Sequence, residues 1–174
     1  KPSSPAFPVL AMILATQGSV EDLDWLVAKA HGDLQNSTPV LSAMQESASI
    51  RELKPRNPNL NSLLTSAVTN GTAAQQIHAL HLIGYWQLLD LRELVITVIF
   101  NTRTSPEVRI AALRSTSHFP KIAEDRIDDL SKLTTLPGDI RIRHAALDAL
   151  TAMNVGRAAQ IAAEALIAAG PSDP

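Results

Sequence analysis

Two histidines three residues apart come closest to a metal-binding motif in this sequence. His78 and His81 fall on one predicted helix, where a spacing of i and i+3 puts both imidazoles on the same face. A zinc site needs further histidine, cysteine or carboxylate ligands beside such a pair. The chain has no cysteine, and the sequence indicates no third ligand. We therefore expect no metal and no other cofactor, and interpret both residues as partly exposed histidines on a helix face.

The motifs of common catalytic sites are missing from the sequence. It contains no Gly-x-Ser-x-Gly, no glycine-rich phosphate loop and no His-Glu-x-x-His. The aromatic content of 3% is too low to favour a platform for single-stranded nucleic acid. The formal net charge of −2 removes the general electrostatic argument for nucleic acid or an anionic membrane. No run approaches the ~18 apolar residues of a membrane span. These absences favour a protein that is not an enzyme.

The composition is typical of an all-α protein. Alanine and leucine dominate it, with 25 and 23 residues, whereas strands favour aromatic and β-branched residues. Residues 94–100 (LVITVIF) have strong strand propensity of their own. Leu94, Val95 and Ile99 nevertheless keep helical spacing. We therefore predict a helix there too.

A repeat of 33 and then 34 residues organises the predicted helices. It superposes residues 75–87, 108–120 and 142–154, each of which we interpret as the second helix of a helix pair. Their apolar positions follow the spacing i, i+1, i+4, i+7, which is one face of an α-helix. The four columns are Ala79/Ala112/Ala146, Leu80/Leu113/Leu147, Ile83/Thr116/Leu150 and Trp86/Phe119/Met153.

A first helix is predicted before each of these segments, and one further pair precedes them. The apolar positions of the first helices are Leu60/Leu63/Leu64, Leu91/Leu94/Val95 and Ile127/Leu130. In the earlier pair they are Leu23/Leu26/Val27, followed by Ala43, Met44 and Ile50 on its second helix. Residues 6–17 and 156–169 read as a half pair at each end. Residues 51–59 (RELKPRNPN) are interpreted as an inserted loop, because they are too long and too proline-rich for a tight turn.

Turn residues agree with these boundaries. Ser19, the sequence Asn70-Gly71-Thr72 and Ser105 supply predicted N-caps, and Pro106 stands where its missing N–H costs nothing. Gly18 and Gly32 are predicted to end helices, since glycine is common just after the last helical turn.

Two of the repeats resemble HEAT repeats, in particular the short, alanine-rich arrays of bacteria. Residues 105–113 (SPEVRIAAL) and 139–147 (DIRIRHAAL) carry that family's acidic turn, Val/Ile-Arg pair, small residues and leucine. The preceding repeat has Gln76 in place of the arginine. The resemblance implies an all-α solenoid, a right-handed superhelix of about four helix pairs in which the second helices line a concave face. We expect residues 1–174 to form one such domain, excised from a longer protein.

The resemblance also bears on Arg109 and Arg143, which stand one repeat apart. It implies that these arginines bond acidic or carbonyl groups in the adjoining turns and do not form an anion-binding row. Glu107 and Asp139 are the candidate partners, because a guanidinium matches carboxylate geometry.

HEAT-like arrays usually serve as interaction scaffolds, so we expect a non-catalytic module that binds or spaces proteins. Its partner would be another protein or neighbouring domains of the same polypeptide. A binding surface is expected at polar columns whose residue types differ from repeat to repeat while the apolar columns beside them stay constant. The expected contact residues are His81, Arg114, His118, Arg141 and Asp148.

Two other functions and one further kind of partner stay open. Some HEAT-like proteins excise alkylated DNA bases, which requires a basic face and a catalytic carboxylate. Large lipid-transfer proteins use similar helical arrays, so a lipid-carrying module is the second alternative. The half pairs also predict self-association through open apolar ends, because terminal repeats normally have a polar outer face. The sequence indicates no cellular compartment.

Overall fold

The computed structural model describes residues 6–34, 37–119, 124–135 and 138–169, and every regular element in these ranges is helical. The protein is therefore all-α, as the composition predicts. The α-helices are α1 (Phe7–Gln17), α2 (Val20–Gly32), α3 (Thr38–Ala48), α4 (Leu60–Asn70), α5 (Ala73–Tyr85), α6 (Arg92–Phe100), α7 (Pro106–Thr116), α8 (Glu124–Thr135), α9 (Ile140–Met153) and α10 (Val155–Ala169). A short 3-10 helix, η2 (Leu89–Leu91), leads into α6.

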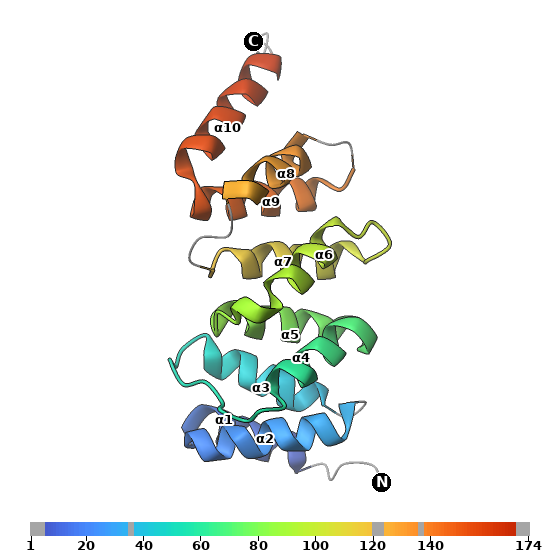
Figure 1. Ribbon diagram of the computed structural model, residues 1–174, viewed down its shortest axis with the longest axis vertical. Helices are drawn as coiled ribbons and strands as arrows, with labels where there is room; N and C mark the ends of the chain where they lie inside the picture. Colours follow the sequence, from blue (N-terminus) through green and yellow to red (C-terminus); the bar gives the residue numbers. More distant parts are fainter. Residues whose placement is uncertain (1–5, 35–36, 120–123, 136–137, 170–174) are drawn as a thin grey trace.

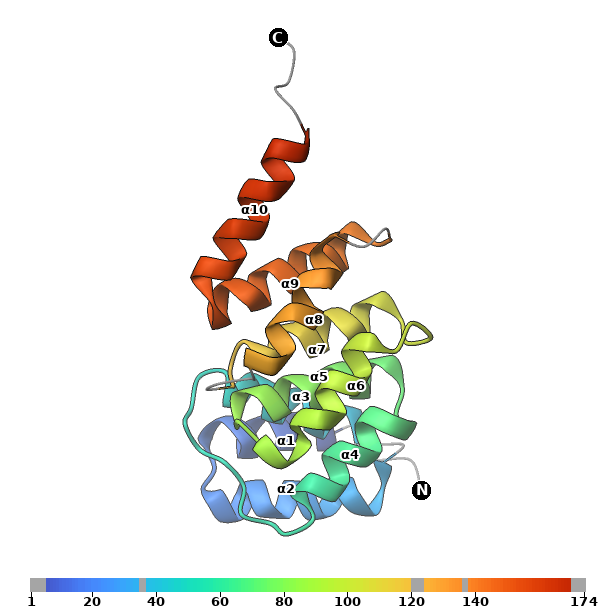
Figure 2. The same cartoon turned by 45° about the horizontal axis from the view of Figure 1, so that its top comes forward.

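The helices lie in two stacked rows (Figures 1 and 2). In the main row α1, α3, α5, α7 and α9 follow one another, and each packs on the next. The flanking row consists of α2, α4, α6 and α8, and each of these packs on the main-row helix that follows it in the chain. Helix α10 packs on α9 and α8 at one end of the molecule. The chain therefore alternates between the rows, which is the arrangement that the paired repeats predict.

Several predicted boundaries are confirmed by capping groups, and others are wrong. Helix α5 ends at Tyr85 and α7 at Thr116, before Trp86 and Phe119, and the Ser105 side chain makes no capping hydrogen bond in the described part of the chain. Ser19 and Asp22 form a reciprocal capping box at the start of α2, and Thr72 and Gln75 form another at the start of α5. Pro106 is the first residue of α7, where its missing N–H has no helical acceptor to lose. Gly18 caps the end of α1, and Gly32 is the last residue of α2.

The apolar columns of the repeat form the core between the rows. Ala79, Ala112 and Ala146 are completely buried, and alanine allows neighbouring main-row helices to approach closely. Trp86 and Phe119 are buried as well. Half-buried Leu147 and Met153 pack at the edge of the same cluster. The polar member of the columns, Thr116, is completely buried and donates its hydroxyl hydrogen bond to the Leu113 carbonyl at 2.6 Å.

One core prediction is wrong, and one ambiguous segment is settled. Ile50 is 79% exposed, because α3 ends at Ala48 and the chain turns away before Ile50 can reach the column. The strand-prone segment is helical in α6, where Val95 and Ile99 are completely buried. Burial of a helical face outweighs local strand propensity there.

Residues 51–59 are a loop, as predicted, and it is held along its length. Arg51 donates hydrogen bonds of 2.7 Å to the carbonyls of Ala15 and Gly18 at the end of α1. The Asp24 carboxylate accepts the backbone N–H of Asn57 at 2.7 Å. Other hydrogen bonds tie Asp24 to Arg56 N and to the Asn57 amide. The indole of Trp86 donates to the Leu53 carbonyl at 3.1 Å, so the loop joins α2 to the end of α5.

Equivalent polar residues join the two rows within a pair. Arg109 Nε donates to the Ile99 carbonyl at 2.8 Å, near the end of α6. In the preceding pair Gln76 Nε2 donates to the Val68 carbonyl at 2.9 Å, near the end of α4. Of the acidic or carbonyl partners predicted for Arg109, the carbonyl is confirmed. The candidate acidic partners of the two arginines, Glu107 and Asp139, instead bond Arg141. The Nε of Arg143 is buried and has no hydrogen-bond partner among the residues that the structure describes.

The first main-row helix has an apolar exposed face. Val9, Leu10 and Ile13 of α1 are all exposed, since no flanking helix among the described residues precedes α1. Self-association through this face stays a prediction. Among the described helices, none has both the length and the apolar character needed to cross a membrane.

Gly84 marks the closest approach of α5 and α7. A Cβ atom built on Gly84 would lie 2.8 Å from the Ser115 carbonyl oxygen and 2.9 Å from Ser115 Cα. These are backbone atoms of a neighbouring helix, so they cannot swing aside as a flexible side chain would. Glycine is required here because the neighbouring helix leaves no room for a Cβ atom, and not because of its backbone angles.

We expect Gly84→Ala to destabilise the protein by about 1–3 kcal/mol, because the methyl group must push α5 from α7. Without that contact, the change would stabilise a helix by up to about 1 kcal/mol. Urea denaturation followed by circular dichroism measures the difference. Gly32→Ala is the matched control, since no atom lies within 4 Å of a Cβ at that helix end. A Gly84→Ala variant as stable as the wild type would contradict the close contact.

Candidate functional site

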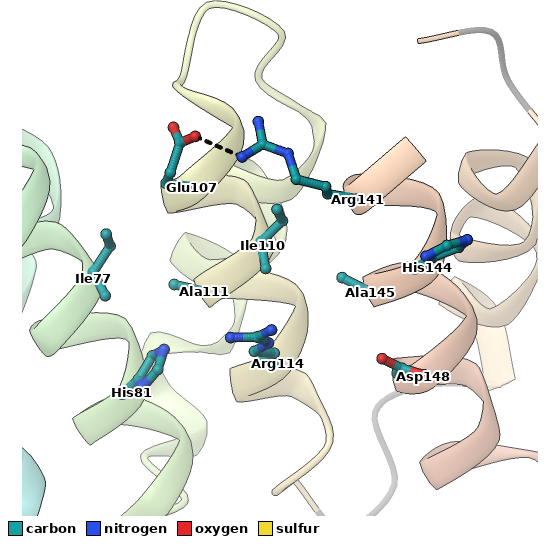
Figure 3. Close-up of a pocket in the computed structure, with 10 residues that line it drawn as sticks. All are labelled: Ile77, His81, Glu107, Ile110, Ala111, Arg114, Arg141, His144, Ala145 and Asp148. Carbon is teal, nitrogen blue, oxygen red and sulfur yellow. Dashed lines mark hydrogen bonds and ion pairs between the residues drawn. The ribbon is translucent and has the colours of Figure 1, made fainter. Parts of the chain in front are cut away.

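A groove of about 500 Å³ crosses the exposed side of three consecutive main-row helices. Figure 3 shows its residues on neighbouring turns of α5, α7 and α9, with their side chains directed into one space. It combines apolar and charged side chains from equivalent positions of three repeats. The lining residues are Ile77, His81, Glu107, Ile110, Ala111, Arg114, Arg141, His144, Ala145 and Asp148.

The repeat period explains why these residues meet. Residues one period apart in sequence occupy the same position on neighbouring main-row helices, and two contacts confirm this. The rings of Tyr85 and His118 have centroids 4.8 Å apart. Arg141 Nη1 lies 3.1 Å from Glu107 Oε1, across a separation of 34 residues. The columns Ile77/Ile110/His144 and His81/Arg114/Asp148 run across the groove in the same way.

Arg141 forms the rim of the groove and is engaged by two carboxylates. Its guanidinium donates hydrogen bonds to Asp139 at 2.6 and 3.1 Å and to Glu107 at 3.1 Å, so it bridges the starts of α7 and α9. Hydrogen bonds from Arg141 lower the pKa of Asp139, and the paired carboxylates raise the pKa of Arg141. The pKa of Glu107 is lowered by its backbone hydrogen bonding and then by Arg141. All three groups are charged at neutral pH.

The centre of the groove holds polar and charged side chains that make no hydrogen bond or ion pair with the described residues. Figure 3 places Arg114 between His81 and Asp148. Across the described ranges of the chain, no hydrogen bond or ion pair holds the side chain of Arg114, His144 or Asp148, and all three are exposed. The half-buried Ile77 and Ile110 supply apolar floor beside them. Free charges over an apolar floor are suited to binding a partner segment.

A smaller pocket of about 360 Å³ adjoins the groove at the end of α7. It shares His81 and Arg114 with the groove and adds Tyr85 and His118. Tyr85 packs edge-on against His118 and also against His81, with centroids 6.2 Å apart in the second contact. His118 therefore belongs to this pocket and not to the groove itself.

Below the groove, His78 and His81 clamp the amide of Gln45 from α3. His78 Nδ1 lies 2.6 Å from Gln45 Oε1, and His81 Nδ1 lies 3.2 Å from Gln45 Nε2. With the amide oriented in this way, Nδ1 of His78 donates and Nδ1 of His81 accepts. Burial lowers the pKa of both histidines, and the nearby Arg114 further lowers that of His81. The pair that resembles half of a metal site thus forms a neutral bridge between helices.

The arrangement is suited to recognition. The described residues contain no cluster of three or more histidine, cysteine or carboxylate side chains placed to hold a metal ion. Of the carboxylates that line the groove, Glu107 has a lowered pKa, whereas a general acid working near neutral pH needs a raised one. The groove can instead bury an apolar side chain while pairing with charges on both sides.

Four of the five contact residues predicted from sequence line the groove: His81, Arg114, Arg141 and Asp148. The fifth, His118, lies in the adjoining pocket. The apolar floor and His144 were missed, although the signal was present. Ile77, Ile110 and His144 each stand four residues before the predicted contact column on the same helices, so they share its face.

We expect the free energy of unfolding to fall as the pH is lowered below about 6.5. The pKa of His78 and His81 is lowered by burial, so the folded protein binds fewer protons than the unfolded chain in that range. The stability they support is complete at higher pH and is lost as pH falls toward their folded pKa. Urea denaturation between about pH 7.5 and pH 5 measures this dependence.

The variant His78→Asn/His81→Asn should show a flatter pH dependence, because asparagine keeps a polar atom near the Nδ1 position and does not titrate. His31→Asn, at an exposed residue of α2, is the matched control and should retain the wild-type slope. Equal slopes for all three proteins would show that the buried pair does not govern the effect.

Comparison with known proteins assigns the chain to no family. The resemblance to HEAT repeats stays a prediction that rests on residues 105–113 and 139–147. No protein-family model matches the chain, and the searches of curated proteins and of solved structures found no match either.

Proposed function

We propose that the protein is a HEAT-like α-solenoid, a right-handed superhelix of helix pairs, that acts as a non-catalytic scaffold by binding a segment of a partner protein. The stacking of α1, α3, α5, α7 and α9 in one row supports the solenoid, because each of these helices packs on the next one in the row and on a flanking helix. Contacts between residues one repeat apart, such as Tyr85 with His118, support it as well.

The groove across α5, α7 and α9 carries the functional proposal. It is an extended surface built from equivalent positions of three repeats, and such surfaces are what stacked repeats offer to a partner. An extended peptide would cross the helices, placing an apolar side chain over Ile77 and Ile110. Its acidic group would pair with Arg114 and its basic group with Asp148, which have no partner of their own among the described residues.

Selection from a random peptide library displayed on phage tests this function. Peptides enriched on the wild-type protein should carry an apolar residue flanked by charges. Arg114→Glu should weaken their binding about 10- to 100-fold, because a charge-assisted hydrogen bond is replaced by repulsion. Fluorescence polarisation with the synthetic peptide measures the change.

Arg103→Glu is the control with the same change of charge, since Arg103 is exposed in the loop between α6 and α7 and lies outside the groove. It should bind the selected peptides as the wild type does. Enriched peptides that bind Arg114→Glu and Ile110→Asp with unchanged affinity would place recognition elsewhere and contradict the proposal.

A fluorescent DNA duplex provides the test against a nucleic-acid enzyme. We expect no binding at low salt, because the net charge is −2 and Glu107 and Asp148 stand beside the arginines of the groove. Tight binding that is released steeply as salt rises would indicate phosphate contacts and would favour the enzyme alternative. Fluorescence anisotropy over a salt series measures both outcomes.

A further inference from the structure

The small pocket at the end of α7 combines several hydrogen-bond donors. Its described lining consists of His81, Tyr85, Arg114, Ser115, Ser117 and His118, and none of these is acidic. We propose that this pocket binds an anionic oxygen group, a carboxylate or a phosphate monoester, presented by the partner segment in the groove. The proposal names the partner's chemistry and rests on the proposed function of the groove.

Arg114 is the anchor of the proposed site. Its guanidinium offers five donors in a planar fork that matches the oxygens of a carboxylate or phosphate. Throughout the described residues no acceptor engages this side chain, in contrast to Arg141, which two carboxylates hold. An incoming anion would therefore not have to displace an internal partner from Arg114.

His81 is a donor to the same pocket without being charged. Its Nδ1 accepts from the Gln45 amide at 3.2 Å, so the proton of the neutral ring is on Nε2. The clamp with His78 holds Gln45 in the orientation that dictates this tautomer. The donor is present at neutral pH, because burial favours the uncharged ring and lowers the pKa of His81.

Tyr85 and His118 complete the lining of the pocket. Their rings pack against each other at an interplanar angle of 63°. For the described part of the chain, no hydrogen bond engages the Tyr85 hydroxyl. It can therefore donate to an oxygen of the ligand.

Two features act against an anion, and both are weakened by existing contacts. The pocket lies at the carbonyl end of α7, but backbone N–H groups of Ser117, His118 and Phe119 already donate to the carbonyls of Arg114, Ser115 and Thr116. The acidic groups of the adjoining groove are Glu107 and Asp148. Arg141 pairs with Glu107 and with Asp139, so its single charge partly offsets theirs, and Asp148 is the carboxylate without an ion pair among the described residues that an anion must approach.

Nuclear magnetic resonance of the full chain with small aryl anions tests the site directly. Benzoate and phenyl phosphate are the probes, and benzamide is the neutral probe of similar shape. We expect both anions at about millimolar concentration to shift the ring resonances of His81 and His118, and benzamide to shift neither. The ratio of the two affinities distinguishes a carboxylate site from a phosphate site.

Arg114→Gln should weaken the binding of the anions at least about tenfold, and Tyr85→Phe should weaken it by a smaller factor. Arg103→Gln is the matched control and should bind as the wild type does. Absence of shifts with both anions, or shifts of equal size in Arg114→Gln, would overturn the proposal.

The peptide and anion experiments together distinguish failure of the anion pocket from failure of the peptide-binding function proposed for the groove. Selected peptides without an acidic residue that still depend on Ile110 would support the groove and overturn the anion pocket. Anion binding that depends on Arg114, together with no peptide enrichment, would support the pocket and remove the proposed scaffold function.

Discussion

Close packing between successive main-row helices is the constraint on which the rest of the structure depends. Ala79, Ala112 and Ala146 are completely buried between them, and Gly84 approaches the backbone of Ser115 closely enough to exclude a Cβ atom. Small residues at one repeating position let each helix meet the next at short distance. Equivalent residues of neighbouring repeats are thereby brought side by side along the whole row.

The groove follows from the same packing on the exposed side of the row. Glu107 reaches Arg141 and Tyr85 reaches His118 because the helices that carry them are one repeat apart and closely stacked. The repeat thus provides a series of equivalent positions with different side chains along one exposed face, as His81, Arg114 and Asp148 illustrate.

Hydrogen bonds from polar side chains hold the helices beneath this surface. Gln45 bridges α3 to His78 and His81 of α5, while Arg109 and Gln76 join flanking helices to main-row helices through backbone carbonyls. Because these polar groups satisfy one another, exposed charges such as Arg114 need not serve the fold. A surface that is not needed for stability can vary in chemistry from repeat to repeat, as the column His81/Arg114/Asp148 does.

The sequence by itself determined the helices, their capped ends and the core columns, because these depend on local propensity and on a spacing that repeats along the chain. It also located His81, Arg114 and Asp148 on one face, since residues of one column share that face. Only the tertiary structure decided the partners of side chains: Glu107 with Arg141, Gln45 with two histidines, and Ile50 with solvent. These side-chain partners depend on how neighbouring helices are rotated about their axes and on where each helix ends. The repeat period of the sequence specifies neither the rotation nor the end.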